Sequence, residues 1–300
     1  MPEYRAHFDA VVEFVNGGSL RADGFRIDLP DRVTDPLTVG RLFVRHLGLA
    51  LVSTVRISDL VVVAEKHRGS RGIETQPIEQ PGRVVDLSHV IRDGLVTYPG
   101  LPAPSVTPHL TRAASRAHYA PGTEFAMDIV TMIGNTGTYL DSPYHRYEGG
   151  ADLAGLDLAT LVGLRAEVFH VQDATNRGVP ASVFFDRDVG GAAVLVHTGW
   201  DRHFATPAYS TGAPYLTVDA TEYLVEQGAL LVGIDSLNVD DTESGGERPV
   251  HSGLLAAGIH VVEHLTNLGE LPPSGARFTA APPAFEGFGT FPVRAFAVVG

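Results

Sequence analysis

From residue 83 onward the chain is a succession of short apolar runs separated by Gly and Pro, and few of these runs lie at the spacing of a β-hairpin. Runs of this length, rich in β-branched residues, are typical of buried strands. The pattern therefore predicts a mixed α/β domain of about 215 residues, within the usual range for a single domain. The expected strands are 84–87, 125–133, 166–171, 192–196, 230–234, 260–262 and 295–299, and the expected helices are 156–161, 218–227 with Thr217 as N-cap, and 251–257.

The first 66 residues have a different pattern. Asn16-Gly17 separates two strand-like runs, and this pair supplies the positive φ values that a tight hairpin turn needs. A run rich in β-branched residues follows later and is expected to join the sheet of the hairpin. The expected elements are strands 8–15, 19–29 and 55–64, and a helix that starts at Asp35-Pro36 and stops at Gly48. Together they predict a small α+β unit.

A polar segment with several basic residues, 66–82, follows this unit. It has the composition of a linker and shows no apolar periodicity. Its basic side chains contact an anionic ligand or partner subunit, or they form a solvated linker. The predicted domains are residues 1–80, a small α+β unit plus linker, and residues 81–300.

Charge and cysteine content exclude several functions. Lys and Arg total 22 against 35 Asp and Glu, a net charge of −13, and no basic patch favours nucleic acid as a partner. The absence of Cys excludes disulfides, thiolate metal sites and a Cys nucleophile. His, Asp and Glu remain as metal-ligand candidates. No run reaches the roughly 20 apolar residues of a membrane span or has the pattern of a signal peptide, so a cytoplasmic protein is expected.

The segment 135–145 combines a carboxylate and an imidazole with two turns of small residues. Asp141 and His145 flank Pro143, which forbids a continuous helix, so their convergence requires a turn. Loops at strand ends commonly carry catalytic groups. Asp and His suit zinc or manganese ligation as well as acid/base chemistry.

Three further features place functional groups at the ends of predicted strands. Trp200 follows Thr198-Gly199 at a strand end and is either a pocket wall or a core plug. Asp235 ends an apolar strand, where it binds a ligand or caps a turn; Asp240 and Asp241 after it are expected in a solvated loop.

The third feature is Glu263, which interrupts an apolar strand twelve residues after His251. Burying a carboxylate there is costly unless a cation or a hydrogen-bond donor meets it, and a structural ion pair with an Arg is the alternative to a metal.

Two common enzyme signatures are absent from the sequence. No Gly-x-Ser-x-Gly elbow supports a Ser nucleophile, and neither a Gly-x-Gly-x-x-Gly motif nor a phosphate loop supports nucleotide binding.

Taken together, these features resemble the metal-dependent cyclase family, which includes bacterial kynurenine formamidase and isatin hydrolase. Its signature is His-x-Gly-Thr-His-x-Asp-x-Pro-x-His. Segment 135–145 keeps five signature positions and has Asn135 and Tyr139 where the family has histidines. The resemblance continues through the following segments: 86–89, 98–100, 198–200, 233–236 and 251–268.

The resemblance implies a swivelling β/β/α cyclase-type fold for residues 84–300, usually oligomeric, so a homodimer or higher homo-oligomer is expected. It also implies ligands for one divalent metal ion, Mn or Zn: Asp141, His251 and Glu263. His145 matches the acid/base residue. Asn and Tyr are poorer zinc ligands than imidazole, so a single-metal site is favoured, with Asn135 or Tyr139 steadying the oxyanion.

The expected function is therefore a metal-dependent hydrolase, or cyclase, that acts on a small aromatic amide, lactam, formamide or lactone. The enzyme class that the resemblance implies is hydrolysis of C–N bonds other than peptide bonds. The predicted substrate contacts are Trp200, Phe125 and Asp235. The alternative is a non-catalytic, ligand-binding or structural family member that has lost its metal centre. Convergence of the three ligand side chains on one point distinguishes the two.

Overall fold

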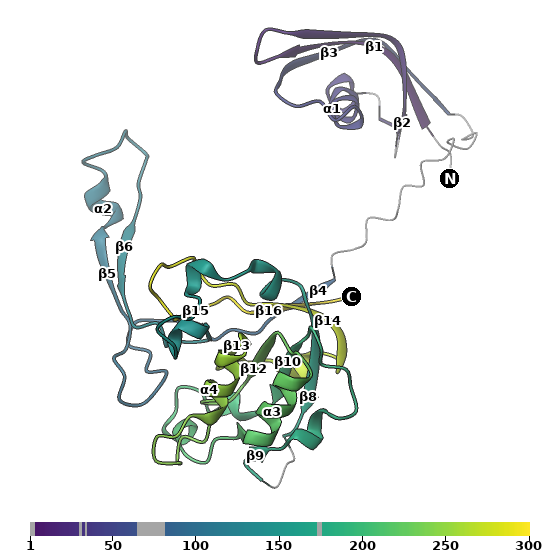
Figure 1. Ribbon diagram of the computed structural model, residues 1–300. Coiled ribbons are helices and arrows are strands. Elements are labelled where there is room, and N and C mark those ends of the chain that lie inside the picture. Colours follow the sequence, from purple (N-terminus) through teal and green to yellow (C-terminus); the bar gives the residue numbers. More distant parts are fainter. Residues whose placement is uncertain (1–3, 30–31, 34, 65–81, 173–175) are drawn as a thin grey trace. The chain divides into compact units, whose positions relative to one another are not determined.

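The computed structural model describes residues 4–29, 32–33, 35–64, 82–172 and 176–300. The chain divides into two compact units, residues 1–78 and 79–300, which are described separately below (Figure 1). The expected linker at 66–82 and the expected boundary at 80–81 fall almost entirely on residues outside the described ranges.

The first unit is a three-stranded antiparallel sheet with one helix, as predicted. Its sheet has the order β2-β1-β3, so the third strand joins the hairpin by pairing with β1. Gly17 adopts φ +83° in the hairpin turn. The Asp35 side chain accepts hydrogen bonds at the start of the helix. The elements are β1 Tyr4–Phe14, β2 Ser19–Leu29, α1 Pro36–His46 and β3 Val52–Ala64.

A small aromatic core holds this unit together. Phe8 and Phe43 are buried and pack edge to face, with ring centroids 5.5 Å apart. Phe8 lies on β1 and Phe43 on α1, so this contact fixes the helix on the sheet.

The second unit is built on a nine-stranded mixed sheet with the order β15-β7-β13-β12-β10-β8-β14-β16-β4. The four central strands β13, β12, β10 and β8 are parallel, and the flanking strands are antiparallel. The strands are β4 Arg83–Asp86, β7 Tyr139–Asp141, β8 Leu164–His170, β10 Ala193–His197, β12 Leu231–Ile234, β13 His260–Glu263, β14 Ser274–Thr279, β15 Thr290–Pro292 and β16 Phe296–Val299. The predicted α/β cyclase-type fold, preceded by a small α+β unit, is confirmed.

The remaining elements cover this sheet or project from it. Helices α3 Val218–Glu226 and α4 Pro249–Ala256 pack on one face, and the arm formed by β5 Ser105–Leu110, α2 Arg112–Ser115 and β6 Met127–Thr131 extends away from the sheet (Figure 1). A two-stranded ribbon pairs β9 Gly178–Val179 with β11 Tyr215–Leu216. Short 3-10 turns lie at Pro143–His145, Leu153–Gly155, Leu158–Thr160, Ala181–Phe184, Trp200–His203, Pro207–Ser210 and Leu268–Glu270.

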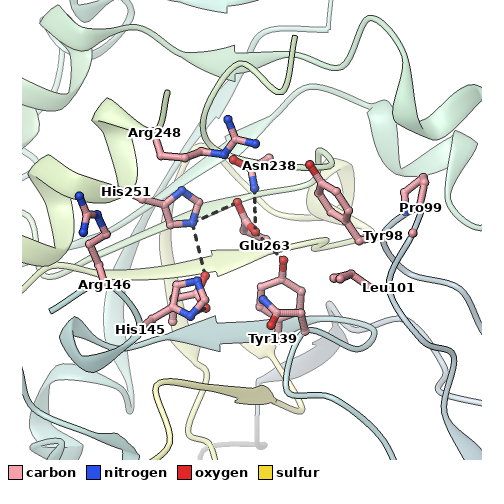
Figure 2. Close-up of a pocket in the computed structure, with 13 residues that line it drawn as sticks. Tyr98, Pro99, Leu101, Tyr139, His145, Arg146, Asn238, Arg248, His251 and Glu263 are labelled. Atoms are coloured by element: carbon pink, nitrogen blue, oxygen red, sulfur yellow. Dashed lines mark hydrogen bonds and ion pairs between the residues drawn. The ribbon is translucent and has the colours of Figure 1, made fainter. Parts of the chain in front are cut away.

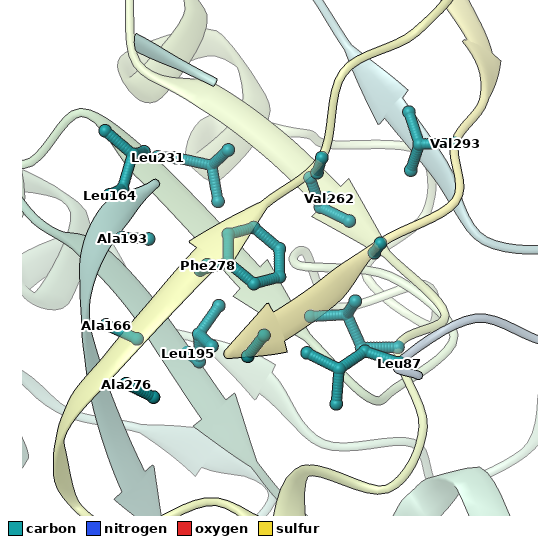
Figure 3. Close-up of a cluster of buried hydrophobic side chains, with 14 of the residues drawn as sticks. Leu87, Leu164, Ala166, Ala193, Leu195, Leu231, Val262, Ala276, Phe278 and Val293 are labelled. Atoms are coloured by element: carbon teal, nitrogen blue, oxygen red, sulfur yellow. The ribbon is translucent and has the colours of Figure 1, made fainter. Parts of the chain in front are cut away.

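Each face of the central strands packs into its own apolar core. On β10, Val194 and Val196 face the helices, whereas Leu195 faces the second core with Phe278 (Figure 3). This second core also takes in residues of the outer strands, so the sheet curls around it. Gly233 of β12 leaves space there, because a Cβ atom at this position would lie 2.7 Å from Leu265 and 2.8 Å from Leu195.

The predicted helix 156–161 is wrong. Leu156 is extended, and only a 3-10 turn forms at Leu158–Thr160. The side chains of Asp152 and Asp157 each start a separate short turn, and these turns replace a continuous helix. The expected helices at 218–227 and 251–257 are present as α3 and α4, although the Thr217 hydroxyl bonds to the Val179 carbonyl instead of capping α3. Among the described residues, no helix is long and apolar enough to cross a bilayer.

Candidate active site

Three acidic and imidazole side chains meet in the second unit. The ligand atoms of Asp141, His251 and Glu263 all lie within 4.8 Å of one another, and all three residues are buried. His251 Nε2 lies 3.4 Å from Asp141 Oδ2 and 3.6 Å from Glu263 Oε1 (Figure 2). The structure therefore brings together the three residues that the family resemblance implies as metal ligands.

The register of two neighbouring strands aligns the carboxylates. Strand β7 pairs antiparallel with β13, so that Tyr139 lies opposite Glu263 and Asp141 opposite Val261. Residues two apart on a strand share a face. Tyr139 and Asp141 therefore point to the same side of the sheet as Glu263.

His251 lies in the first turn of α4 and is oriented by Asp240. One carboxylate oxygen of Asp240 accepts the backbone N–H of His251 and lies 2.7 Å from His251 Nδ1, and the other accepts the N–H of Val250. With Nδ1–H donated to Asp240, Nε2 of His251 faces Asp141 and Glu263, and its lone pair is exposed to a metal once the proton on Nε2 is displaced. This is the tautomer that a metal ligand requires.

The electrostatics of the cluster favour a cation. Burial alone would lower the pKa of His251, but the three carboxylates around it, led by Glu263, raise it to about 10. Burial raises the pKa of Glu263 to about 7, with His251 opposing the rise and Asp141 adding to it. Without a cation, the cluster thus retains protons that binding of a divalent ion would displace.

Two observations test whether these residues fit a metal ion. Asp141 Oδ2 is buried and has no hydrogen-bond partner among the described residues. Two ligands about 2.1 Å from one tetrahedral centre are separated by about 3.4 Å, which agrees with the distances from His251 Nε2 to Asp141 and Glu263. Two carboxylates and one imidazole suit zinc or manganese. The residues fit a single divalent ion.

His145 is held beside the triad by Thr290. The Thr290 hydroxyl donates to Asp141 Oδ1 and lies 2.6 Å from His145 Nδ1. Because its only proton goes to the carboxylate, the hydroxyl accepts from His145 Nδ1–H, which leaves the Nε2 lone pair of His145 free. Gly289 permits this arrangement, since a Cβ atom there would lie 2.4 Å from the backbone nitrogen of His145.

A buried hydrogen-bond chain ends on Glu263. The Tyr139 hydroxyl lies 2.7 Å from Glu263 Oε2 and 3.2 Å from His264 Nε2, and His264 Nδ1 lies 2.8 Å from the Tyr209 hydroxyl. Burial, with the carboxylates of Glu263 and Asp141 nearby, keeps the pKa of Tyr139 well above its ordinary value. Tyr139 thus donates to Glu263 and accepts from His264 Nε2–H, and Tyr209 donates to Nδ1.

The triad lies at the base of a pocket of about 440 Å³, a usual size for a small-molecule site. The three residues expected to be catalytic, Asn135, His145 and Tyr139, also line this pocket. The lining residues are Tyr98, Pro99, Gly100, Leu101, Asn135, Tyr139, Asp141, His145, Arg146, Asn238, Arg248, His251 and Glu263 (Figure 2).

The three expected substrate contacts lie elsewhere. Trp200 is partly buried, packs in a small cluster with Tyr209, to whose carbonyl its Nε1 donates, and lines a separate, smaller pocket. Asp235 is fully buried and accepts from the backbone and hydroxyl of Thr198. Phe125 lies on the arm and is half exposed. The structure brings none of the three to the pocket.

The prediction for Asp240 is wrong, and several residues of the site were not predicted from the sequence. Asp240 was expected in a solvated loop, but it is 2% exposed because α4 begins directly against it. Asp241 is half-buried and pairs with Arg177. The missed residues are Thr290, His264, Tyr209, Asn238, Arg146 and Arg248. Thr290 and Tyr209 join the site only through contacts distant in sequence, and no local signal marks them.

Comparison with known proteins identifies the family. The sequence model of the family described as putative cyclase matches residues 85–241, just over half of the chain. The chain belongs to this cyclase family. The match lies wholly within the second unit.

Relatives match along nearly their whole length. Kynurenine formamidase of Geobacillus thermodenitrificans is 29% identical over 212 residues, which cover 70% of this chain and 95% of the relative. Isatin hydrolase A from Ralstonia solanacearum has a similar fold, with a TM-score of 0.61 and 23% identity over 73% of this chain and 92% of its own. The structure of a potential metal-dependent hydrolase with cyclase activity is also similar, with a TM-score of 0.57 and 26% identity over 72% of this chain and 96% of its own. These relatives agree with the predicted enzyme class.

Proposed function

We propose that this protein is a metal-dependent hydrolase that cleaves a C–N bond other than a peptide bond in a small aromatic amide, lactam or formamide. Lactone hydrolysis and the related cyclase reaction use the same groups. The observation that carries the proposal is the convergence of Asp141, His251 and Glu263 at the base of the pocket, with Nδ1 of His145 3.8 Å from Asp141 Oδ1. The kynurenine formamidase and isatin hydrolase relatives support the substrate class.

Asp141, His251 and Glu263 would hold one divalent ion, Mn or Zn. When bound, such an ion supplies Lewis-acid activation of water and of the substrate carbonyl. Asp240 fixes the tautomer of His251. Tyr139 fixes Glu263 by donating its single proton. Because the hydroxyl proton of Tyr139 is already donated to Glu263, Tyr139 has no proton left for the developing oxyanion. Asn135 is therefore the donor to the oxyanion.

His145 acts as the general base and acid. Its free Nε2 takes a proton from the attacking water as the new C–O bond forms at the carbonyl carbon. The same imidazolium then gives the proton to the leaving nitrogen as the C–N bond breaks. The products are a carboxylic acid and an amine. Thr290 holds the ring by accepting from Nδ1–H.

The proposal is tested with a panel of N-formylkynurenine, isatin and simple lactones, assayed with and without added manganese or zinc. Protein purified without chelators is expected to contain a divalent metal and to turn over at least one amide or lactam. His145→Gln should lower kcat by about 10²- to 10⁴-fold while metal content stays unchanged. His109→Gln, an exposed change on the arm, is the control.

The contrary result is a protein without bound metal and without metal-stimulated turnover on the whole panel. That outcome would favour the alternative of a family member without catalysis.

A further inference from the structure

Two arginines line the same pocket as the triad. Arg146 directly follows His145 at the end of a 3-10 turn, and Arg248 occupies the N-cap position of α4, three residues before His251. Short, well-defined elements therefore fix both backbones relative to the triad. Figure 2 shows the two side chains on the side of His251.

Neither guanidinium is neutralised by a carboxylate within the described part of the chain. Arg146 donates from Nε to the Ser252 hydroxyl at 3.3 Å and lies over the ring of Tyr147. Arg248 donates from Nη1 to the backbone carbonyl of Glu247. These contacts use neutral acceptors. Because a guanidinium has five N–H donors, most of the donors on each arginine remain for a ligand.

The opposite side of the pocket is mainly apolar. Tyr98, Pro99 and Leu101 lie across from the arginines (Figure 2). A flat apolar body fits against these side chains, with a charged substituent directed toward the arginines. Glu263 and Tyr139 lie between the two sides, and the reacting bond would be held there (Figure 2).

The charge balance of the pocket favours an anion. A divalent ion on the triad neutralises the two ligand carboxylates, Asp141 and Glu263. Arg146 and Arg248 then give the pocket mouth a net positive charge, although the whole chain carries −13. The planar fork of a guanidinium matches the two oxygens of a carboxylate.

We propose that Arg248 and Arg146 form an anion subsite that selects amide substrates carrying a carboxylate away from the scissile C–N bond. This inference rests on the proposed function for its reaction, but the subsite itself is defined by binding. Arg248 is the principal contact, since it is half-buried and Arg146 is exposed.

The test compares formanilide with its 2-, 3- and 4-carboxylate derivatives and their methyl esters. At least one carboxylate is expected to be hydrolysed with a kcat/KM about 10- to 100-fold above that of its ester, the range for charge-assisted hydrogen bonds. Arg248→Gln should remove most of this ratio and Arg146→Gln a smaller part. The control is Arg277→Gln, an equal charge change on the exposed side of β14.

Calorimetry of aminobenzoates and aniline separates the subsite from the reaction. Binding of an aminobenzoate that weakens in Arg248→Gln, both with and without metal, supports the subsite even if no formanilide is cleaved. Turnover without a preference for the carboxylate, or aminobenzoate binding unaffected by Arg248→Gln, would overturn it. A phosphonate analogue preferred over the carboxylate would also contradict the assignment.

Discussion

The hydroxyl of Tyr139 lies 2.7 Å from Oε2 of Glu263, directly across the β7–β13 pair. The family resemblance implies a histidine at this position, and a phenol is a poorer zinc ligand than imidazole. Its role here is to hold the carboxylate. His264 and Tyr209 continue the chain behind it, and the backbone N–H of Val239 donates to the other oxygen of Glu263, Oε1, at 2.7 Å.

Removing the Tyr139 hydroxyl should weaken metal binding. We expect Tyr139→Phe to lower the affinity for zinc or manganese by about 10- to 100-fold, the usual effect of losing a group that orients a ligand. Competition with a chromogenic chelator measures this. Tyr223→Phe on α3 is the control, because its hydroxyl makes no hydrogen bond to the described residues. Equal affinities for wild type and Tyr139→Phe would show that Glu263 needs no such support.

Asp240 is expected to affect metal binding through His251. Asp240→Asn keeps the acceptor for Val250 but presents an amide N–H₂ to Nδ1–H of His251, which disfavours the ligand tautomer. Metal affinity should again fall by about 10- to 100-fold. Asp241→Asn, one residue further on, breaks only the ion pair with Arg177 and should leave affinity unchanged. An equal loss in both variants would point to general damage to this loop.

Burial of His260 predicts acid sensitivity. Burial lowers its pKa to about 4, against about 6.5 in an unfolded chain. As the pH falls from 6.5 toward 4, His260 binds a proton in the unfolded state but stays neutral in the folded state. The free energy of unfolding therefore decreases. Above pH 6.5 the group has no effect.

His260→Gln removes this proton uptake. The free energy of unfolding of wild type minus that of the variant should fall by about 2 kcal/mol between pH 7.5 and pH 5 in denaturant titrations. The exposed His109→Gln is the matched control for the loss of an imidazole. A constant difference for His260→Gln would mean that burial does not lower the pKa of this ring in the folded protein.

The sequence predicted the strands better than the surroundings of the site. The hairpin at Asn16-Gly17 and the buried strands could be predicted because the turn residues and the pattern of apolar residues lie within a few adjacent positions. The helix predicted for 156–161 is wrong because apolar spacing alone does not reveal the effect of Asp152 and Asp157. Their side chains accept backbone N–H groups and so start short turns in place of a helix.

The three metal-ligand candidates could be predicted from the family resemblance. The residues that hydrogen-bond to the site from distant parts of the chain could not. Thr290 reaches Asp141 from 149 positions away, and Tyr209 reaches His264 from 55. Such contacts depend on the assembled sheet. Asp240 was misjudged for the same reason, since its burial is decided by where α4 starts. The predicted homo-oligomer stays a prediction.

Asp141, His251 and Glu263 are proposed to bind one divalent ion per chain. Isothermal titration of chelator-stripped protein with zinc or manganese tests it most directly, with Glu263→Gln as the comparison. We predict a stoichiometry of about one ion for the wild type and an affinity at least about 100-fold weaker for the variant, which loses a charged ligand. No saturable binding, or equal binding by Glu263→Gln, would contradict the account.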